Sequence, residues 1–456
     1  MIQRCFKVRE RGSSVRTEIL GGATTFVTMA YIIVVNPAIL SFAGIQVGPS
    51  TVATILTAVV GCLLMAFIAN RPIAVAPYMG ENAFIAFGLA ALGIGWQQRL
   101  GAVFVSGALF LLITVFRLRS WLANSISTSM KHSFAVGIGL FLAFIGLYET
   151  GIVTSFVAGM PVDAVAHGAT ILPTPDVPLK IGNLRDAQVL LAVGGFLLMC
   201  VLLYRRVHGA LLIGIAVTAG TGIALGFGKA PTGAMALPFV GEYSLAPIAL
   251  QMDVAGVLKL SFLPILLTLF LMSLLDTLGT LVGVGAAGNM LDEHGDFPDI
   301  ERPMLVDALT CMFSGAIGTS TSGAYIESAT GIREGARTGL ASVVTALLFA
   351  ASLFFIPLVA PLQQLRFAYG PALIAVGVLM LGSIRKVAFD DLTELAPAFV
   401  TVVMMLFTYN IANGLTAGLV VYPLLKLATG RWRELKAGSV VLSLLCLVYY
   451  VFGLPH

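Results

Sequence analysis

Long apolar runs separated by short polar segments dominate the chain. A membrane-spanning helix needs about 20 predominantly apolar residues, and the pattern predicts fourteen such spans, seven in each half of the sequence. The first seven spans are expected at 19–41, 50–70, 77–95, 100–117, 130–148, 187–204 and 208–228. The second seven are expected at 255–283, 303–317, 322–335, 337–360, 371–385, 394–409 and 411–428. A shorter apolar run at 438–453 fits either an extra span or an interfacial helix.

The composition agrees with a membrane protein rather than a soluble one. Hydrophobic residues make up 58% and charged residues 11%, whereas soluble proteins contain about 25% charged residues. The net charge of +4 comes from scattered basic residues, so we expect no nucleic-acid partner. The cysteines are far apart and form no CxxC motif, so we expect no disulfide framework, metal site or cofactor. They are Cys5, Cys62, Cys200, Cys311 and Cys446.

Basic residues fall mainly at one side of the predicted membrane. With residues 1–18 in the cytoplasm, 20 of the 26 Lys and Arg lie in cytoplasmic segments, as the positive-inside rule requires. We therefore expect a multi-pass protein of the cell (inner or plasma) membrane with a cytoplasmic N-terminus. Seven is an odd number, so the second half is expected to be inverted relative to the first. The predicted repeats are 19–228 and 255–428, with an extracellular linker at 229–254 and a C-terminal segment at 429–456.

One small, polar stretch interrupts the second half. Residues 318–331 read GTSTSGAYIESATG, a composition that hydrocarbon tolerates only where the segment is buried in protein or lines a cavity. Thr321 and Ser322 are good N-cap residues. They predict an unwound strand followed by a helix that begins in mid-membrane and runs through Tyr325 and Glu327. Helices interrupted in this way mark binding sites in secondary transporters.

The first half carries a weak echo of that stretch. Residues 80–87 read GENAFIAF and follow the helix-breaking segment 71–77. The series Ala-Phe-Ile at 83–85 matches Ala-Tyr-Ile at 324–326. The echo predicts a second broken helix, so that the third and tenth spans are both broken and both preceded by short strands.

Acidic residues inside spans are costly and usually functional, and the predicted spans contain Glu81, Asp276, Asp307 and Glu327. Asp276 shares a helix face with Ser273, Thr277 and Thr280, a face expected to look inward. The alternative for this face is a hydrogen-bonded seam between helices. Asp307 lies close to Arg302 and could instead pair with it near the interface.

Asn82 also has two interpretations. It stands where the first broken helix is expected to begin, so it could cap that helix, contact a ligand, or do both. Nearby aromatic residues could stack on a flat ring or simply fill the core. They are Phe26, Tyr31, Tyr78, Phe84 and Tyr325.

Three blocks, NAFIAF, LLDTLGTLVGVGAAGNML and GTSTSGAYIESATGIREGARTGL, resemble AzgA-type purine permeases, a branch of the nucleobase–cation symporter-2 family. The resemblance covers nearly the whole chain. It implies an all-α polytopic membrane protein with a uracil-permease-like fold of fourteen spans in two inverted repeats. A core domain (19–117 plus 255–360) would slide against a gate domain (118–228 plus 361–428) in an elevator-type movement. The implied activity is uptake of a purine base together with protons.

The same resemblance implies binding or transport roles for Asn82, Asp276 and Glu327. Two positions depart from it: family members typically have a carboxylate where this chain has Ser273, and leucine where it has Glu81. Glu81 could replace the missing carboxylate, or it could be a solvated residue paired with Arg71. The expected proton-coupling residues are Asp276, Glu327 and Glu81. The expected substrate-binding set is Asn82, Asp276, Glu327, Glu81, Ser273, Thr277, Tyr325 and Gly323.

Several alternatives stay open from sequence. Within transporters, the substrate could be xanthine, uracil or another small heterocycle, whereas acidic residues argue against an anion exchanger. An intramembrane aspartyl protease built on Asp276 and Asp307 is a remote alternative. A channel is not indicated, because the sequence shows no ring of like charges. We expect a transporter and no enzyme. The preferred base and the formation of a homodimer are left open.

Overall fold

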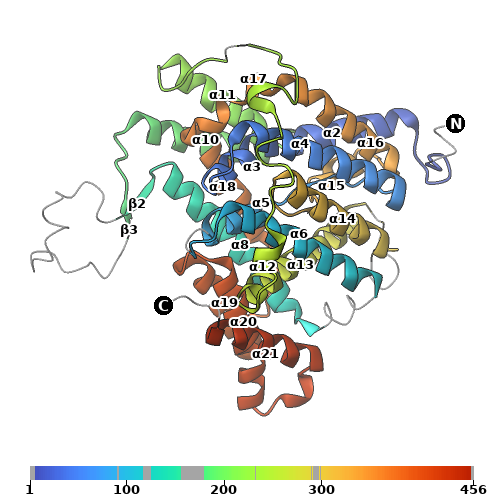
Figure 1. The fold of residues 1–456 in the computed structure, drawn as a ribbon, viewed down its shortest axis with the longest axis vertical. Helices are drawn as coiled ribbons and strands as arrows, with labels where there is room; N and C mark the ends of the chain where they lie inside the picture. The colour runs from blue at the N-terminus through green and yellow to red at the C-terminus, as the bar shows by residue number, and fades with distance from the viewer. Residues whose placement is uncertain are drawn as a thin grey trace, which may run out of the picture.

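The computed structural model describes residues 6–89, 92–116, 125–155, 179–231, 233–288, 290, 297 and 299–452. Cys5 lies outside these ranges, as do three of the 20 basic residues assigned to the cytoplasmic side, Arg4, Arg117 and Arg119. Helices make up almost all of the fold (Figure 1). Within the described ranges, nine helical segments are long and apolar enough to cross a membrane. They are Val15–Ser41, Val47–Ala69, Trp96–Val115, Thr128–Glu149, Ala187–Tyr204, Leu260–Gly285, Gly339–Val359, Arg366–Lys386 and Ile411–Ala428.

One bundle combines helices from the start of each half. Its members are α2 (Val15–Met29), α3 (Ile32–Ser41), α4 (Val47–Leu64), α6 (Trp96–Val115), α13 (Leu263–Ala287), α14 (Glu301–Ile317) and α16 (Gly339–Ser352). The α6 helix packs on α14, and α16 packs on α2 and α4 (Figure 1). Glycines permit this close approach. A Cβ atom at Gly107 would lie 2.9 Å from the Met312 backbone nitrogen, so α6 and α14 meet backbone to backbone.

A second bundle combines the later helices of each half. Its members are α8 (Thr128–Glu149), α10 (Ala187–Tyr204), α11 (Ala210–Ala224), α18 (Arg366–Leu381), α19 (Leu392–Phe407) and α20 (Ile411–Ala428). The longest contact runs between α8 and α18, where a Cβ atom at Gly146 would lie 2.7 Å from the Gly370 carbonyl oxygen. The helix α21 (Ala437–Phe452) packs on α20. It covers residues 438–452 of the predicted apolar run 438–453, whose last residue lies outside the described ranges, and it is shorter than a membrane span.

The helix contacts of the two halves correspond to one another. Just as α6 packs on α13 and α14, so α16 packs on α2 and α4. In the second bundle α8 packs on α19 and α20, and α18 packs on α10 and α11. The contacts that α6 and α8 make with helices of the second half are thus matched by the contacts that α16 and α18 make with helices of the first half. Two inverted repeats would produce this pattern.

Two short strands meet between the halves. β1 (Val75–Pro77) pairs antiparallel with β4 (Ser322–Ala324), Ala76 opposite Gly323. The pairing extends at both ends through equivalent hydrogen bonds. The Tyr78 amide donates to the Thr321 carbonyl oxygen, and the Tyr325 amide to the Ala74 carbonyl oxygen, each over 2.9 Å. This symmetry makes Tyr78 the structural equivalent of Tyr325.

The structure corrects three local predictions. The helix α15 spans Ser328–Arg333, so the helix start predicted at Thr321 and Ser322 is wrong. Residues 322–324 form a strand instead, because a buried backbone needs partners and β1 supplies them. The helix α5 (Met79–Ala83) begins after Tyr78, so the predicted N-cap role of Asn82 is wrong. The proposed echo is also out of register, since Tyr325 corresponds to Tyr78 rather than to Phe84.

The remaining elements are short. A five-residue π-helix follows α4 at Met65–Ala69, and another follows α5 at Phe84–Gly88. The strands β2 (Val153–Ser155) and β3 (Leu179–Ile181) form a second antiparallel pair outside the helical bundles (Figure 1). The helices α12 (Val254–Val257) and α17 (Ile356–Val359) lie in connections. The 3-10 helices are Gly241–Tyr243, Leu260–Phe262, Leu353–Phe355, Leu362–Gln364, Gly382–Lys386 and Trp432–Glu434.

Candidate functional site

Two tyrosines stand where the strands end. The rings of Tyr78 and Tyr325 are nearly parallel, with an interplanar angle of 7° and centroids 6.4 Å apart. The Tyr325 hydroxyl donates to the Pro77 carbonyl oxygen, while the Tyr78 hydroxyl lies 3.0 Å from the Thr277 hydroxyl. Gly323 is required here because a Cβ atom would collide with the Tyr78 hydroxyl. Each tyrosine is thus fixed by the opposite strand or by α13.

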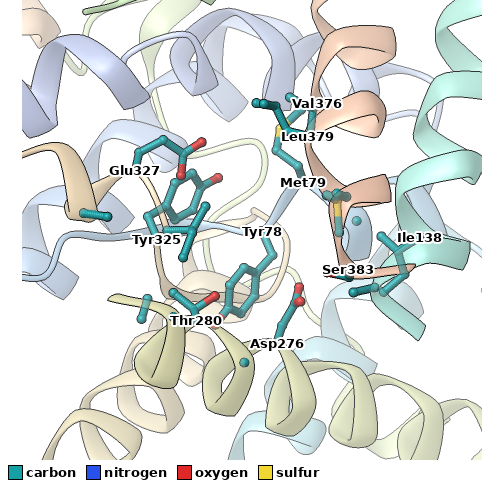
Figure 2. A pocket seen from close by; sticks show the side chains of 18 of the residues that line it. Tyr78, Met79, Ile138, Asp276, Thr280, Tyr325, Glu327, Val376, Leu379 and Ser383 are labelled. Atoms are coloured by element: carbon teal, nitrogen blue, oxygen red, sulfur yellow. The ribbon is translucent and has the colours of Figure 1, made fainter. Parts of the chain in front are cut away.

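A cavity of about 1660 Å³ lies between the two bundles. One wall carries Tyr31, Tyr78, Asp276, Tyr325 and Glu327. The facing wall comes from α8 and α18, and the part of it opposite these residues is mostly apolar (Figure 2). Its residues include Ile138, Val376, Leu379 and Met380. Of the predicted binding residues, Asp276, Tyr325 and Glu327 line this cavity, whereas Asn82, Glu81, Ser273, Thr277 and Gly323 do not.

The two carboxylates in the cavity wall are held differently. The Tyr31 hydroxyl donates to Glu327 Oε1 over 2.9 Å, which orients that carboxylate. Asp276 lies on α13 beside Thr280 and Tyr78 (Figure 2) and forms no hydrogen bond or ion pair with any described residue. Asp276 is therefore free to accept hydrogen bonds from a ligand, and Glu327 is preoriented to do so.

Asp307 lies directly behind the strands. It is fully buried, and its Oδ2 accepts hydrogen bonds from the Thr277 hydroxyl (2.8 Å) and the Ala324 amide (3.0 Å). Its Oδ1 has no partner among the described residues. The predicted pairing with Arg302 is wrong, because the side chain turns inward from α14 toward β4. Thr277 therefore links Tyr78 to Asp307, a support role that its place on the Asp276 face did not reveal.

Glu81 and Ser273, the two departures from the family pattern, are in direct contact. The Ser273 hydroxyl donates to Glu81 Oε2 over 2.8 Å, and the Glu81 side chain is fully buried. The alternative of a solvated residue paired with Arg71 is therefore wrong. The pair lies outside the cavity lining, where α5 meets α13.

Asn82 points away from the cavity toward α3. Its Nδ2 donates to Asn36 Oδ1 over 2.9 Å, and the Asn36 Nδ2 donates in turn to the hydroxyls of Thr54 and Thr319. Ser320 also donates to Asn36 Oδ1. Asn36 thus joins α3, α4, α5 and the segment before β4. Sequence reasoning missed this residue, although an asparagine within the apolar run VVNPAIL was a visible signal.

The described acidic side chains around the site do not form a metal-binding cluster. Among the described residues, no group of three or more His, Cys, Asp or Glu could hold a metal ion. The arrangement instead offers two accessible carboxylates and three tyrosines to a small polar ligand. A flat molecule with several N–H groups fits that chemistry, because each carboxylate can accept more than one hydrogen bond.

Comparison with known proteins places this geometry in a family. A family profile described as "Permease family", that of the xanthine/uracil permeases, matches residues 16–416. A permease of Methanocaldococcus jannaschii is 41% identical over 99% of this chain and 98% of its own. The adenine permease AdeQ of Escherichia coli is 39% identical over 97% of this chain and 95% of its own. The guanine/hypoxanthine permease PbuO of Bacillus subtilis is 36% identical over 96% of this chain and 98% of its own.

Solved structures support the fold at lower sequence identity. The transmembrane domain of a cyanobacterial bicarbonate transporter, BicA, superimposes with a TM-score of 0.65 at 16% identity. The match covers 88% of this chain and 97% of that one. It shows a shared polytopic, mostly helical membrane fold. Because the family and its members are permeases, the protease alternative built on Asp276 and Asp307 is excluded. The chain belongs to the xanthine/uracil permease family, the nucleobase–cation symporter-2 family of membrane transport proteins.

Proposed function

We propose that this protein takes up a purine nucleobase (adenine, guanine or hypoxanthine) together with protons. The observation that carries the proposal is the pair of carboxylates, Asp276 and Glu327, facing one cavity beside three tyrosines. The names of AdeQ and PbuO, which describe purine bases as their substrates, support the same substrate class. Xanthine, uracil or another small heterocycle is the alternative on the same site.

Each side chain has a role in this proposal. Asp276 and Glu327 accept hydrogen bonds from ligand N–H groups, and the aromatic rings of Tyr78 and Tyr325 flank the flat base. Glu81, Ser273, Thr277, Asn82 and Gly323 act from behind, by holding the helix starts and strands that carry the cavity wall. Such a site rejects analogues that leave its buried polar groups without partners.

Proton coupling is supported by the lack of ion pairs between these carboxylates and the basic residues that the structure describes. Glu81, Asp276, Asp307 and Glu327 form no ion pair with a described Lys or Arg. Ionising all four in an apolar setting would cost several kcal/mol per group. We infer that Asp276, Glu327 or Glu81 carries a proton during part of the cycle.

The transport movement in this proposal is a sliding of one bundle against the other. Residues 19–117 plus 255–360 form the core domain, and residues 118–228 plus 361–428 form the gate domain. Beyond the nine long segments, the fourteen-span topology is completed by α11, α14, α19 and the two strand–helix units β1–α5 and β4–α15. The cavity reaches Lys131, Arg206, Arg333 and Lys386, which the positive-inside rule assigns to the cytoplasm. In this proposal the described conformation is inward-facing, and the oligomeric state is left open.

Uptake measurements test the function. Cells that lack their own purine transporters and express this chain should accumulate labelled adenine, guanine or hypoxanthine saturably. Uptake should rise as external pH falls, collapse with an uncoupler, and be indifferent to replacing sodium with choline. An Asp276→Asn variant at equal expression serves as the inactive control. A strict sodium requirement would contradict proton coupling, and transport of uracil or xanthine alone would favour the alternative.

A further inference from the structure

The cavity continues well beyond the two carboxylates to an end lined with basic side chains. Lys131 and His132 lie in the first two turns of α8, and Lys386 is the last residue of the 3-10 helix after α18. All three line the same cavity as Asp276 and Glu327. Its volume of about 1660 Å³ exceeds the roughly 300–1,000 Å³ of typical small-molecule pockets. A free purine base would leave most of this space unfilled.

These basic groups are not neutralised by ion pairs within the part of the chain that the structure describes. Neither Lys131 nor Lys386 forms an ion pair with a residue that the structure describes. They influence one another instead: His132 lies within electrostatic range of Lys131 and Lys386, and Lys131 within range of Lys436. Holding like charges together costs free energy unless an anion is present to offset it.

The acidic groups at this end lie on the opposite wall and have basic neighbours. Glu334 is 3.8 Å from His208, and Asp299 is within electrostatic range of Arg71. Among the described lining residues at this end, the remaining acid is Glu301, on α14 of the first bundle. Arg206 and Arg333 also line the cavity, so basic side chains occur on more than one wall. On the wall formed by α8 and α18, Lys131 and Lys386 form no ion pair with a described acid.

The distance between the two ends of the cavity can be estimated along α8. A Cβ atom at Gly80 would collide with Ile138, so Ile138 lies level with the start of α5 beside Tyr78. Lys131 precedes Ile138 by two helical turns, which is about 10 Å along the axis. The ribose and 5′-oxygen of a nucleoside 5′-monophosphate span part of this length, and the long side chains of Lys131 and Lys386 can span the rest.

We propose that Lys131, His132 and Lys386 form a phosphate subsite, through which a purine nucleoside monophosphate occupies the cavity from the cytoplasm. The inference rests on the proposed purine site, since the base of the nucleotide sits between Asp276 and Glu327. The base then contacts one bundle and the phosphate the other. A ligand that bridges both bundles opposes their relative movement, so the nucleotide acts as a cytoplasmic inhibitor of base transport.

Competition binding on the purified full-length protein tests this proposal. Labelled adenine is displaced by AMP, adenosine or inorganic phosphate, and labelled guanine by GMP, guanosine or inorganic phosphate. For the matching base, the nucleotide should compete at least tenfold better than its nucleoside, and phosphate alone should not compete. Lys131→Gln with Lys386→Gln should weaken nucleotide competition by roughly tenfold or more, the loss expected for hydrogen bonds to a charged group. Base affinity should change less than about twofold.

Arg385→Gln is the matched control. Arg385 is adjacent to Lys386, exposed, and absent from the cavity lining, so its replacement should leave nucleotide competition unchanged. Equal competition by nucleoside and nucleotide, displacement by phosphate alone, or an unaffected double variant would each overturn the subsite. If the base binds but the nucleotide does not compete with it, this inference is overturned and the proposed function is unaffected. No base binding to the wild-type protein would overturn the proposed function together with it.

Discussion

The contact between Glu81 and Ser273 yields a prediction in which two harmful substitutions compensate each other. The Ser273 hydroxyl donates to the buried Glu81 carboxylate over 2.8 Å. Ser273→Asp alone would set a second carboxylate against the first. At about 4 Å and an effective dielectric constant of about 20, two such charges repel by about 4 kcal/mol. The single variant should therefore lose transport and unfold at a lower temperature.

Glu81→Leu alone should lose transport for a different reason. It removes the only carboxylate of this pair and leaves the Ser273 hydroxyl without its acceptor, at a stability cost of about 1–3 kcal/mol. Combining Glu81→Leu with Ser273→Asp removes the repulsion and restores one carboxylate, carried by α13 instead of α5. The double variant should regain part of the transport that either single variant lacks.

The assay is initial-rate uptake of labelled purine at matched expression, with thermal unfolding of the purified variants in detergent. Ser273→Ala is the control, since it removes the hydrogen bond without adding charge and should retain most of its activity. If Glu81→Leu transports as well as the parent, Glu81 has only a structural role. If Ser273→Asp is as stable and active as the parent, the two side chains are not in contact.

Three further outcomes follow from the site and from one surface cluster. Glu327→Gln and Asp276→Asn should each abolish high-affinity base binding in an equilibrium assay, because an amide offers one acceptor where a carboxylate offers two; unchanged affinity would remove that residue from the site. Tyr31→Phe deletes the hydrogen bond to Glu327. It should weaken binding by roughly ten- to hundredfold, because a hydrogen bond to a charged group contributes about 1.5–3 kcal/mol. Wild-type affinity would show that Glu327 is oriented otherwise. Outside the membrane, a hydrogen bond from Thr393 and the Arg431 guanidinium lower the pKa of Asp391 to about 2, below its ordinary value of about 4. This stabilisation is present above about pH 4 and is lost as pH falls toward 2, so Asp391→Asn should lower the thermal unfolding temperature at pH 7 and matter progressively less in acid.

Sequence patterns predicted the large elements well because bilayer thickness dictates them. The nine long apolar segments coincide with predicted spans, and both predicted short strands, β1 and β4, are present. Local capping rules failed at Thr321 and Ser322, which favour a helix start in isolation. The partner strand lies some 247 residues away along the chain, and no local pattern carries that information.

The sequence indicated which residue types belong to the candidate site, but not which of them line the cavity and which lie in the layer behind it. Asp276, Tyr325 and Glu327 line the cavity, as their chemistry suggested. Asp307 was expected near the interface because it lies one turn inside its span, yet the hydrogen bonds from Thr277 and Ala324 draw it behind the strands. Whether a side chain faces the cavity or the layer behind it depends on helix rotation and on distant partners, which spacing along one helix does not specify.

The two halves contribute equivalent strand backbones to the cavity wall, but the side chains that these strands and the following helices carry differ. The symmetric hydrogen bonds around β1 and β4 make Tyr78 equivalent to Tyr325, and by the same offset Gly80 equivalent to Glu327. The aromatic rings are thus repeated, whereas the carboxylate is not. At Gly80 the packed Ile138 leaves no space for a side chain, while Glu327 opens into the cavity. In the proposed function, the unequal set of hydrogen-bond acceptors would recognise a molecule whose edges differ. A purine base has such edges, so the inequality between the repeats is what the proposed substrate requires.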